Sequence, residues 1–190
     1  MPNITKVTKD DIINESLKIV KEKGMESLNA RTIAKGLSCS IQPVYYHFPN
    51  MMILRNMVLE EIRKIYHKYI NDSEKSDQPH FKAIGLAYIN FAYCEPNYFK
   101  LLFMNDSNYQ FEMSNLIDDN YEYVLNTIIT EYDIKRSETQ KFYENIWVTT
   151  HGLASMIATN FIKPDIEKVS NILSNAFFGL LMLVRKNELL

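Results

Sequence analysis

The stretch NARTIAKGLSCSIQPVYYHFPN, residues 29–50, decides the fold of the first part of this chain. Asn29 is a favourable helix cap, and the residues from Ala30 to Leu37 have the pattern of a short helix. The polar triplet 38–40 then forms a turn, and a second short helix is expected to start at Ile41. Two short helices joined by a three-residue turn predict a helix-turn-helix, although an ordinary helical hairpin would have the same periodicity.

The second helix of this pair separates apolar positions from polar ones. Ser40 is expected to cap it, and Pro43 fits its first turn because the missing N–H removes no intrahelical bond. Val44 and Phe48 are expected to face inward against the first helix. The side chains left to project outward are Gln42, Tyr45, Tyr46 and His47. Planar polar side chains of this kind can hydrogen-bond to base edges and phosphates of DNA.

The rest of the chain also predicts helices, so the expected fold class is all-α with about nine helices. The chain has 190 residues, of which 46% are hydrophobic, and its 5 Gly and 6 Pro are too few for a loop-rich sandwich or barrel. A helix from Thr8 to Gly24 precedes the quoted stretch. The expected division is a helix-turn-helix domain over residues 1–50 and a helical domain over 51–190. The later helices are expected at 50–71, 79–95, 96–104, 112–132, 137–161 and 165–187, with a loop at 105–109 and a capping box at Ser137–Gln140.

Charge and cysteine content limit the classes of function. The net charge is −2, yet Lys and Arg outnumber Asp and Glu through Arg55, so a basic first part precedes an acidic remainder. Two cysteines cannot form a disulfide framework and favour a reducing compartment. The polar start of the chain is unlike a signal peptide, and the longest apolar run, Ala176–Val184, is too short to cross a bilayer. We therefore expect a cytoplasmic protein without a membrane partner.

The run Val44–Phe48, which follows Ile33–Lys35 and precedes Pro49, resembles the recognition-helix signature of the TetR family of transcription regulators. The resemblance implies that Gln42 and Tyr46 contact bases and that Ile41 and Pro43 contact thymine methyl groups. It also implies that Tyr45 holds a phosphate with help from His47. The implied DNA-binding set is Arg31, Ser40, Ile41, Gln42, Pro43, Tyr45, Tyr46 and His47. Arg31 is equally compatible with a solvated surface side chain.

One position departs from the family pattern. The family commonly has a lysine directly after this motif, whereas this chain has Met51 followed by Met52. A missing cation removes one counterion-release contribution, so weaker binding with a smaller salt dependence is expected.

The later part of the chain resembles a subgroup of the same family. The segment Phe91–Phe103 is similar to its junction between two central helices, and Trp147, His151 and Gly152 match its spaced Trp-His-Gly pattern. The resemblance implies a pocket for a small apolar effector, although each aromatic residue is also compatible with plain core. The implied pocket residues are Tyr88, Phe91, Phe99, Phe103, Tyr121, Trp147 and His151.

The last helix is apolar on almost every face, which favours burial against a second copy of the chain. A fully internal helix is the alternative. The resemblance implies a homodimer that reads a palindromic operator, with an interface formed by Ala176, Phe177, Leu180, Leu181 and Val184.

An enzyme and a helical interaction module are the two other classes of function to compare with the sequence. An enzyme is not expected, because the four histidines are scattered and no phosphate-binding loop, zinc-ligand spacing or nucleophile motif is present. No cofactor or metal is expected for the same reason. A helical interaction or sensor module that has lost DNA binding is the alternative that Met51 and Met52 leave open.

Overall fold

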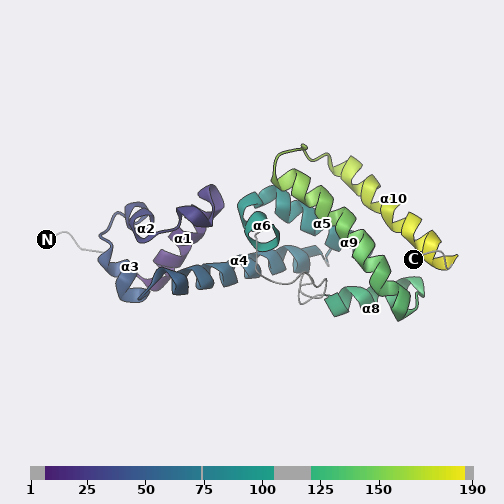
Figure 1. Ribbon diagram of the computed structural model, residues 1–190, viewed down its shortest axis with the longest axis horizontal. Helices are drawn as coiled ribbons and strands as arrows, with labels where there is room; N and C mark the ends of the chain where they lie inside the picture. The colour runs from purple at the N-terminus through teal and green to yellow at the C-terminus, as the bar shows by residue number, and fades with distance from the viewer. Residues whose placement is uncertain (1–6, 74, 105–120, 187–190) are drawn as a thin grey trace.

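The protein is described by a computed structural model that covers residues 7–73, 75–104 and 121–186. Over these residues it contains nine α-helices, one short 3-10 helix and no strand, which confirms the all-α prediction. Three helices form one end of the molecule, and α4 runs from them to a body of longer helices at the other end (Figure 1). The elements are α1 (Lys9–Lys23), η1 (Met25–Ser27), α2 (Ala30–Gly36), α3 (Gln42–His47), α4 (Met51–Ser73), α5 (His80–Cys94), α6 (Pro96–Phe103), α8 (Tyr121–Tyr132), α9 (Arg136–Ala158) and α10 (Ile166–Arg185).

The ends of α1 follow from its sequence. The Thr8 hydroxyl accepts a hydrogen bond from the Asp11 backbone N–H at 3.1 Å, and the Asp11 carboxylate accepts one from the Thr8 N–H at 2.8 Å. The Thr8 hydroxyl also donates to the Asp11 carboxylate at 2.6 Å. This bond and the one from the Thr8 N–H lower the pKa of Asp11, because both favour the charged carboxylate. Gly24 ends the helix with a φ of 81°, which favours glycine. The predicted helix from Thr8 to Gly24 is thus confirmed.

The start and end of α9 differ from the prediction. The expected capping box at Ser137–Gln140 is wrong: α9 begins one residue earlier, and its N-cap residue, Lys135, makes no side-chain capping bond. The Thr139 hydroxyl instead donates to the Lys135 carbonyl at 2.9 Å. Asn160 has a φ of 58°, a left-handed conformation just beyond the end of the helix at Ala158. The loop predicted at 105–109 and the helix predicted over 112–120 lie outside the described residues.

Helix α4 connects the two ends of the molecule through one buried stripe. Its buried side chains follow four-residue steps and are Leu54, Val58, Ile62, Tyr66 and Ile70. The first part of α4 packs against α1, and α4 also packs against α5 in the body. One hydrophobic core therefore runs from α1–α3 through α4 into α5, α6, α9 and α10, without a break at residue 50.

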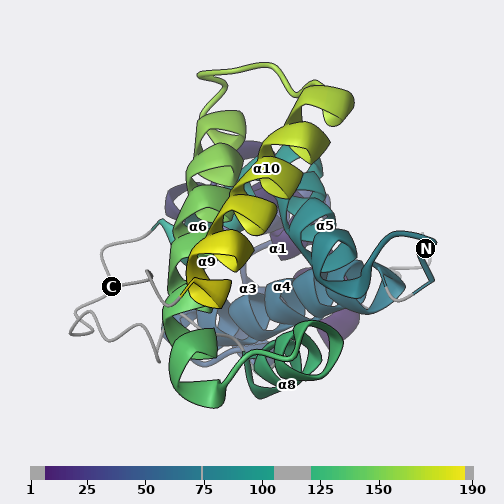
Figure 2. The same ribbon diagram turned by 90° about the vertical axis from the view of Figure 1, so that its right-hand side faces the viewer.

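The far side of the body is formed by α9 and α10. The two helices run antiparallel and side by side, with α5 behind them (Figure 2). A second cluster of buried residues holds them to α8 and includes Phe142, Ile146, Phe177, Leu181 and Val184. Within the described ranges, no helix combines the length and apolar character needed to cross a membrane.

Candidate nucleic-acid interface and ligand cavity

The helix pair α2–α3 is fixed at its first end by Asn29. The Asn29 side chain accepts hydrogen bonds from the backbone N–H groups of Arg31 and Thr32, both at 3.1 Å. The Thr32 hydroxyl in turn accepts a bond from the Asn29 N–H at 3.1 Å. These bonds satisfy N–H groups that the first turn of a helix leaves without partners. The capping role predicted for Asn29 is confirmed.

The turn between the helices uses a left-handed residue instead of the expected serine cap. Ser38 has a φ of 52°, and the Cys39 N–H donates to the Ala34 carbonyl at 2.9 Å. The predicted capping role of Ser40 is wrong, because the N-cap residue of α3 is Ile41 and no side chain caps this helix. Pro43 occupies the first turn, as predicted.

Helix α3 is held against the core by one face and exposes the other. Val44 and Phe48 are fully or almost fully buried, and each contributes roughly 1.5–3 kcal/mol relative to an exposed side chain. Tyr46 is 78% exposed and Tyr45 48% exposed. The predicted DNA-binding residues that lie on the surface are Arg31, Ser40, Ile41, Gln42, Tyr45 and Tyr46. The residues forming one side of α3 are thus free to contact a large partner.

The two other predicted DNA-binding residues, Pro43 and His47, are half-buried. His47 was expected to project outward, and it does not. Its Nε2 atom lies 3.1 Å from the carbonyl oxygen of Val7, and its ring contacts the edge of the Tyr46 ring with centroids 5.0 Å apart. The imidazole therefore joins α3 to the chain before α1 and supports Tyr46, instead of projecting into solvent. Pro43 is the other half-buried residue.

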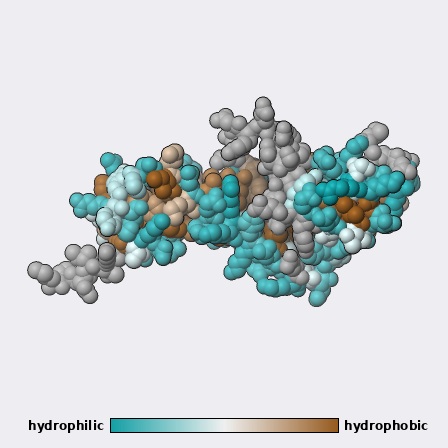
Figure 3. All heavy atoms as spheres, turned by 90° about the horizontal axis from the view of Figure 1, so that it is seen from below, coloured by the Kyte–Doolittle hydropathy of each residue, from teal (hydrophilic) through white to brown (hydrophobic). Residues whose placement is uncertain are grey.

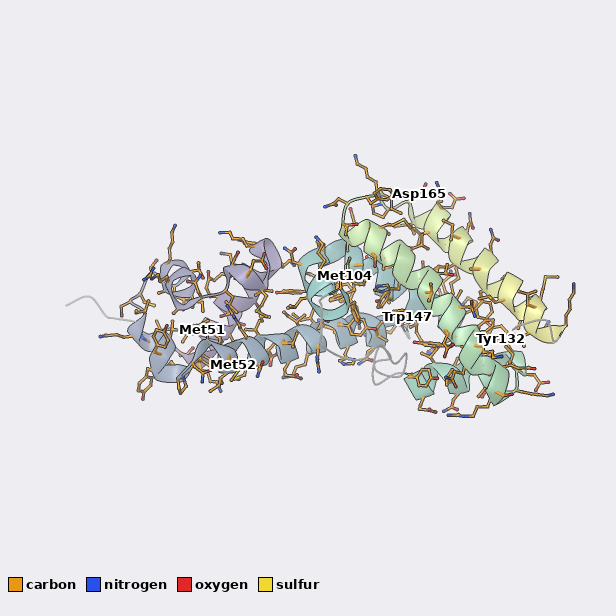
Figure 4. The ribbon with its side chains drawn as sticks, in the orientation of Figure 1. Met51, Met52, Met104, Tyr132, Trp147 and Asp165 are labelled. Carbon is orange, nitrogen blue, oxygen red and sulfur yellow. The ribbon has the colours of Figure 1, made fainter. Side chains whose placement is uncertain are left out.

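The first turn of α4 continues this surface without adding a cation. The Asn50 side chain accepts a hydrogen bond from the Ile53 N–H at 3.0 Å and so caps the helix. Met51 is half-buried against the core, whereas Met52 is 68% exposed (Figure 4). Hydrophobic residues also break the hydrophilic surface at this end of the molecule (Figure 3). The first turn of α4 thus carries exposed apolar side chains, Met52 and Ile53, and no cation.

Sequence reasoning missed Arg55. Its guanidinium donates to the Leu28 carbonyl at 3.1 Å, which ties α4 to the loop just before α2. Leu28 is itself fully buried. A long-range bond from an arginine to a backbone carbonyl has no signature in the sequence, because it depends on how two separate segments pack.

A second junction joins α1 to α6 and was also missed. The Lys21 ammonium lies 2.7 Å from the Glu95 carboxylate, which is almost buried. The Asn97 amide donates to the Lys21 carbonyl, and the Tyr98 hydroxyl donates to the Leu17 carbonyl, both at 2.8 Å. Burial, with a smaller contribution from the Glu95 charge, raises the pKa of Tyr98 to about 12. The first three helices are thus linked to the body by specific polar contacts as well as by α4.

The body contains a small, mainly apolar cavity of about 60 Å³ between α4, α5 and α9, with one lining residue each from α6 and α8. Three predicted pocket residues line it, namely Tyr88, Phe103 and Trp147. Trp147 lies on the side of α9 that faces the interior of the body (Figure 4). Phe91 and Phe99 are fully buried core instead, and Tyr121 packs on the Tyr143 ring. The other described lining residues are Tyr66, Ile70, Phe81, Ile84, Gly85, Val124, Tyr143, Ile146 and Thr150.

His151 lies just behind this cavity within a stacked polar network. Its ring is parallel to that of Trp147, with an interplanar angle of 8° and centroids 4.7 Å apart. Its Nδ1 atom lies 2.9 Å from the Tyr88 hydroxyl, and its Nε2 atom lies 3.2 Å from the Ser155 hydroxyl. Burial lowers the pKa of His151, so the neutral ring is favoured. His151 therefore orients two cavity residues and is not itself part of the cavity wall.

The residues expected at a dimer interface lie on or beside the face of α10 that packs inside the chain. Phe177, Leu181 and Val184 are buried within the chain, where Phe177 contacts the rings of Phe81 and Phe142. Ala176 and Leu180 are half-buried beside them. The exposed face instead carries Phe178, Met182 and Leu183. The amphipathic pattern of α10 thus serves the internal core first and leaves a second apolar stripe on the surface.

Comparisons with known proteins leave the family open. No protein-family model matches the chain, and no curated protein matches it. Within the described residues, no group of three or more His, Cys, Asp or Glu side chains is placed to hold a metal ion.

Proposed function

We propose that the protein is a sequence-specific DNA-binding transcription regulator that acts as a repressor. The observation that carries the proposal is the two-faced character of α3. Val44 and Phe48 anchor it in the core, while Gln42, Tyr45 and Tyr46 stand on its exposed side. A glutamine amide can bond an adenine at two atoms, and tyrosine hydroxyls can donate to phosphates.

A second copy of the chain would complete the DNA-reading unit. The exposed stripe of Phe178, Met182 and Leu183 on α10 offers an apolar surface for a symmetric partner. A two-fold dimer with its two α3 helices about 34–36 Å apart reads two half-sites in successive major grooves. The corresponding operator is therefore a palindrome.

The proposed effector is a small apolar molecule that enters the central cavity. The volume of the cavity, about 60 Å³, is far below the roughly 300–1,000 Å³ of a pocket that holds a drug-sized molecule. A ligand of that size must therefore separate the helices that line the cavity, and α4, which leads directly to α3, is one of them. Binding that favours the separated arrangement shifts the population away from the DNA-binding form.

The direct test is selection of DNA from a random-sequence duplex library by the purified protein. The expected result is enrichment of one palindromic sequence by the wild-type protein and its loss in Tyr46→Ala. Phe161→Ala is a matched control, because Phe161 is equally exposed, at 78%, but lies between α9 and α10. A library that stays random after repeated rounds would contradict the proposal.

A helical interaction or sensor module is the second candidate. It is favoured by the apolar side chains beside α3, among them Ile41, Met52 and Ile53, which are 44%, 68% and 41% exposed. A module that no longer binds DNA would show no duplex binding even at low salt, where phosphate contacts are strongest. A gel-shift assay over a range of salt concentrations separates the two candidates.

A further inference from the structure

A second cavity, of about 120 Å³, lies between the first half of α5 and the middle of α10. Its apolar walls include Phe81, Leu173, Phe177 and Phe178. The Phe81 and Phe177 rings lie 5.0 Å apart between centroids, and Tyr132 contacts the Phe177 ring edge-on at 4.8 Å. An apolar cavity of about 150 Å³ in another protein accepts benzene, so this volume suits one aromatic ring.

Two groups that line this cavity are suited to an anion. Lys82 forms no ion pair with any residue that the structure describes, and the Tyr132 hydroxyl forms no hydrogen bond there. Burial raises the pKa of Tyr132, so its hydroxyl keeps its proton and remains a donor. An ammonium and a phenol are donors that a carboxylate accepts.

The hydroxyl groups of the other polar lining residues are already engaged. The Ser174 hydroxyl donates to the Ser170 carbonyl at 2.9 Å, and the Thr150 hydroxyl donates to the Ile146 carbonyl at 2.8 Å. Both bonds lie within one helix, so these protons are not available to a ligand. Among the described lining side chains, the donors that remain available are thus those of Lys82 and Tyr132.

We propose that this cavity binds a small carboxylate with a single aromatic ring. The ring occupies the space beside Phe81 and Phe177, and the carboxylate binds the ammonium of Lys82. The site adjoins the effector cavity of the proposed function, and its occupation does not depend on DNA binding. Phe81, Gly85 and Thr150 line both cavities, so occupation of one changes the walls of the other.

The test uses benzoate and toluene as probes and measures their dissociation constants by titration calorimetry. Lys82→Met keeps most of the side-chain stem but removes the charge. It is expected to weaken benzoate binding by about tenfold and to leave toluene binding unchanged. Lys168→Met, an equally charge-changing substitution at an exposed position of α10 outside the cavity, should leave both constants unchanged.

A filling variant locates the ring. Ser174 lines this cavity and not the central one, so Ser174→Leu should abolish binding of both probes, whereas Ser174→Ala should retain it. Thermal unfolding followed by circular dichroism verifies that each variant is folded. If the wild-type protein does not bind benzoate at millimolar concentration, the proposal is overturned. Unchanged benzoate affinity in Ser174→Leu or in Lys82→Met would do the same, because the probe would then lie elsewhere or without its charge contact.

Discussion

The amide of Gln42 is exposed on α3, and its proposed role can be tested by one substitution. Gln42→Ala is expected to lose about 1–3 kcal/mol of discrimination at one base position, since a bidentate contact with adenine is removed. Competition assays with operators changed one base pair at a time measure this loss. Gln78→Ala, at an exposed position between α4 and α5, is the control. An equal loss on all sequences would mean that Gln42 contacts only the DNA backbone.

Met52 offers a place for a cation at the first turn of α4. Its side chain is 68% exposed, so Met52→Lys costs little packing, whereas Met51→Lys would disturb a half-buried contact. If the side chain faces the DNA backbone, Met52→Lys should tighten binding and steepen the log–log salt dependence by about one unit. Fluorescence anisotropy over a series of salt concentrations gives the slope. An unchanged slope would place this turn away from the phosphates.

At the scale of elements, the contact of α6 with α1 predicts a response to alkaline pH. The pKa of Tyr98 is about 12 in the folded protein and about 10 in an unfolded chain. The neutral hydroxyl is thus favoured by folding, and its contribution is complete below pH 10 and is lost as the pH rises toward 12. Tyr98→Phe has no hydroxyl to ionise, so this loss of stability at high pH disappears. The substitution also removes the hydrogen bond to the Leu17 carbonyl, which is worth about 1 kcal/mol near neutral pH.

The measurement is the free energy of unfolding from urea titrations at pH 8 and pH 11. The wild-type protein should be more stable than Tyr98→Phe at pH 8, and the difference in free energy of unfolding between the two proteins should shrink at pH 11. Other tyrosines, such as Tyr69 with a pKa of about 12, titrate in both proteins and so cancel in the comparison. A constant difference would show that Tyr98 does not ionise in this range.

The elements differ in how well the sequence predicted them. α1 begins after Thr8 and ends at Gly24, and α2 begins after Asn29, as predicted, because these signals act within one turn of the chain. α9 was misplaced at its start, because Ser137 and Gln140 resemble a capping box although the helix already begins at Arg136. Local motifs therefore locate most of the helices, but they cannot distinguish two neighbouring starts of equal local quality.

At the scale of the whole molecule, the exposed stripe of α10 predicts the state of association. Phe178 is 58% exposed, and in a symmetric dimer formed by this stripe each copy would lie near its equivalent. Phe178→Glu is therefore expected to yield monomers, since two buried like charges cost several kcal/mol. Phe161→Glu is the control on an exposed aromatic outside α10. Sedimentation analysis distinguishes the two, and a dimeric Phe178→Glu would exclude this face.

The candidate sites were predicted only where side-chain direction follows from periodicity. On α3 the alternation of Val44 and Phe48 with Gln42 and Tyr46 was sufficient, and the structure places these residues as expected. In α10 the apolar residues surround the helix, so the sequence could not tell that Phe177 faces the internal core and Phe178 the surface. That distinction depends on which side of α10 packs against α5 and α9.

The bonds from Asn97 and Tyr98 to α1 have one feature in common: both acceptors are main-chain carbonyls, those of Lys21 and Leu17. Every residue type supplies such an oxygen, so these two hydrogen bonds themselves do not depend on the side chain at either acceptor position. Of these three contacts, only the salt bridge uses a side chain of the first helix, that of Lys21. A chimaera that carries another protein's three-helix end would therefore keep two of the three attachments, provided that its first helix follows the same path.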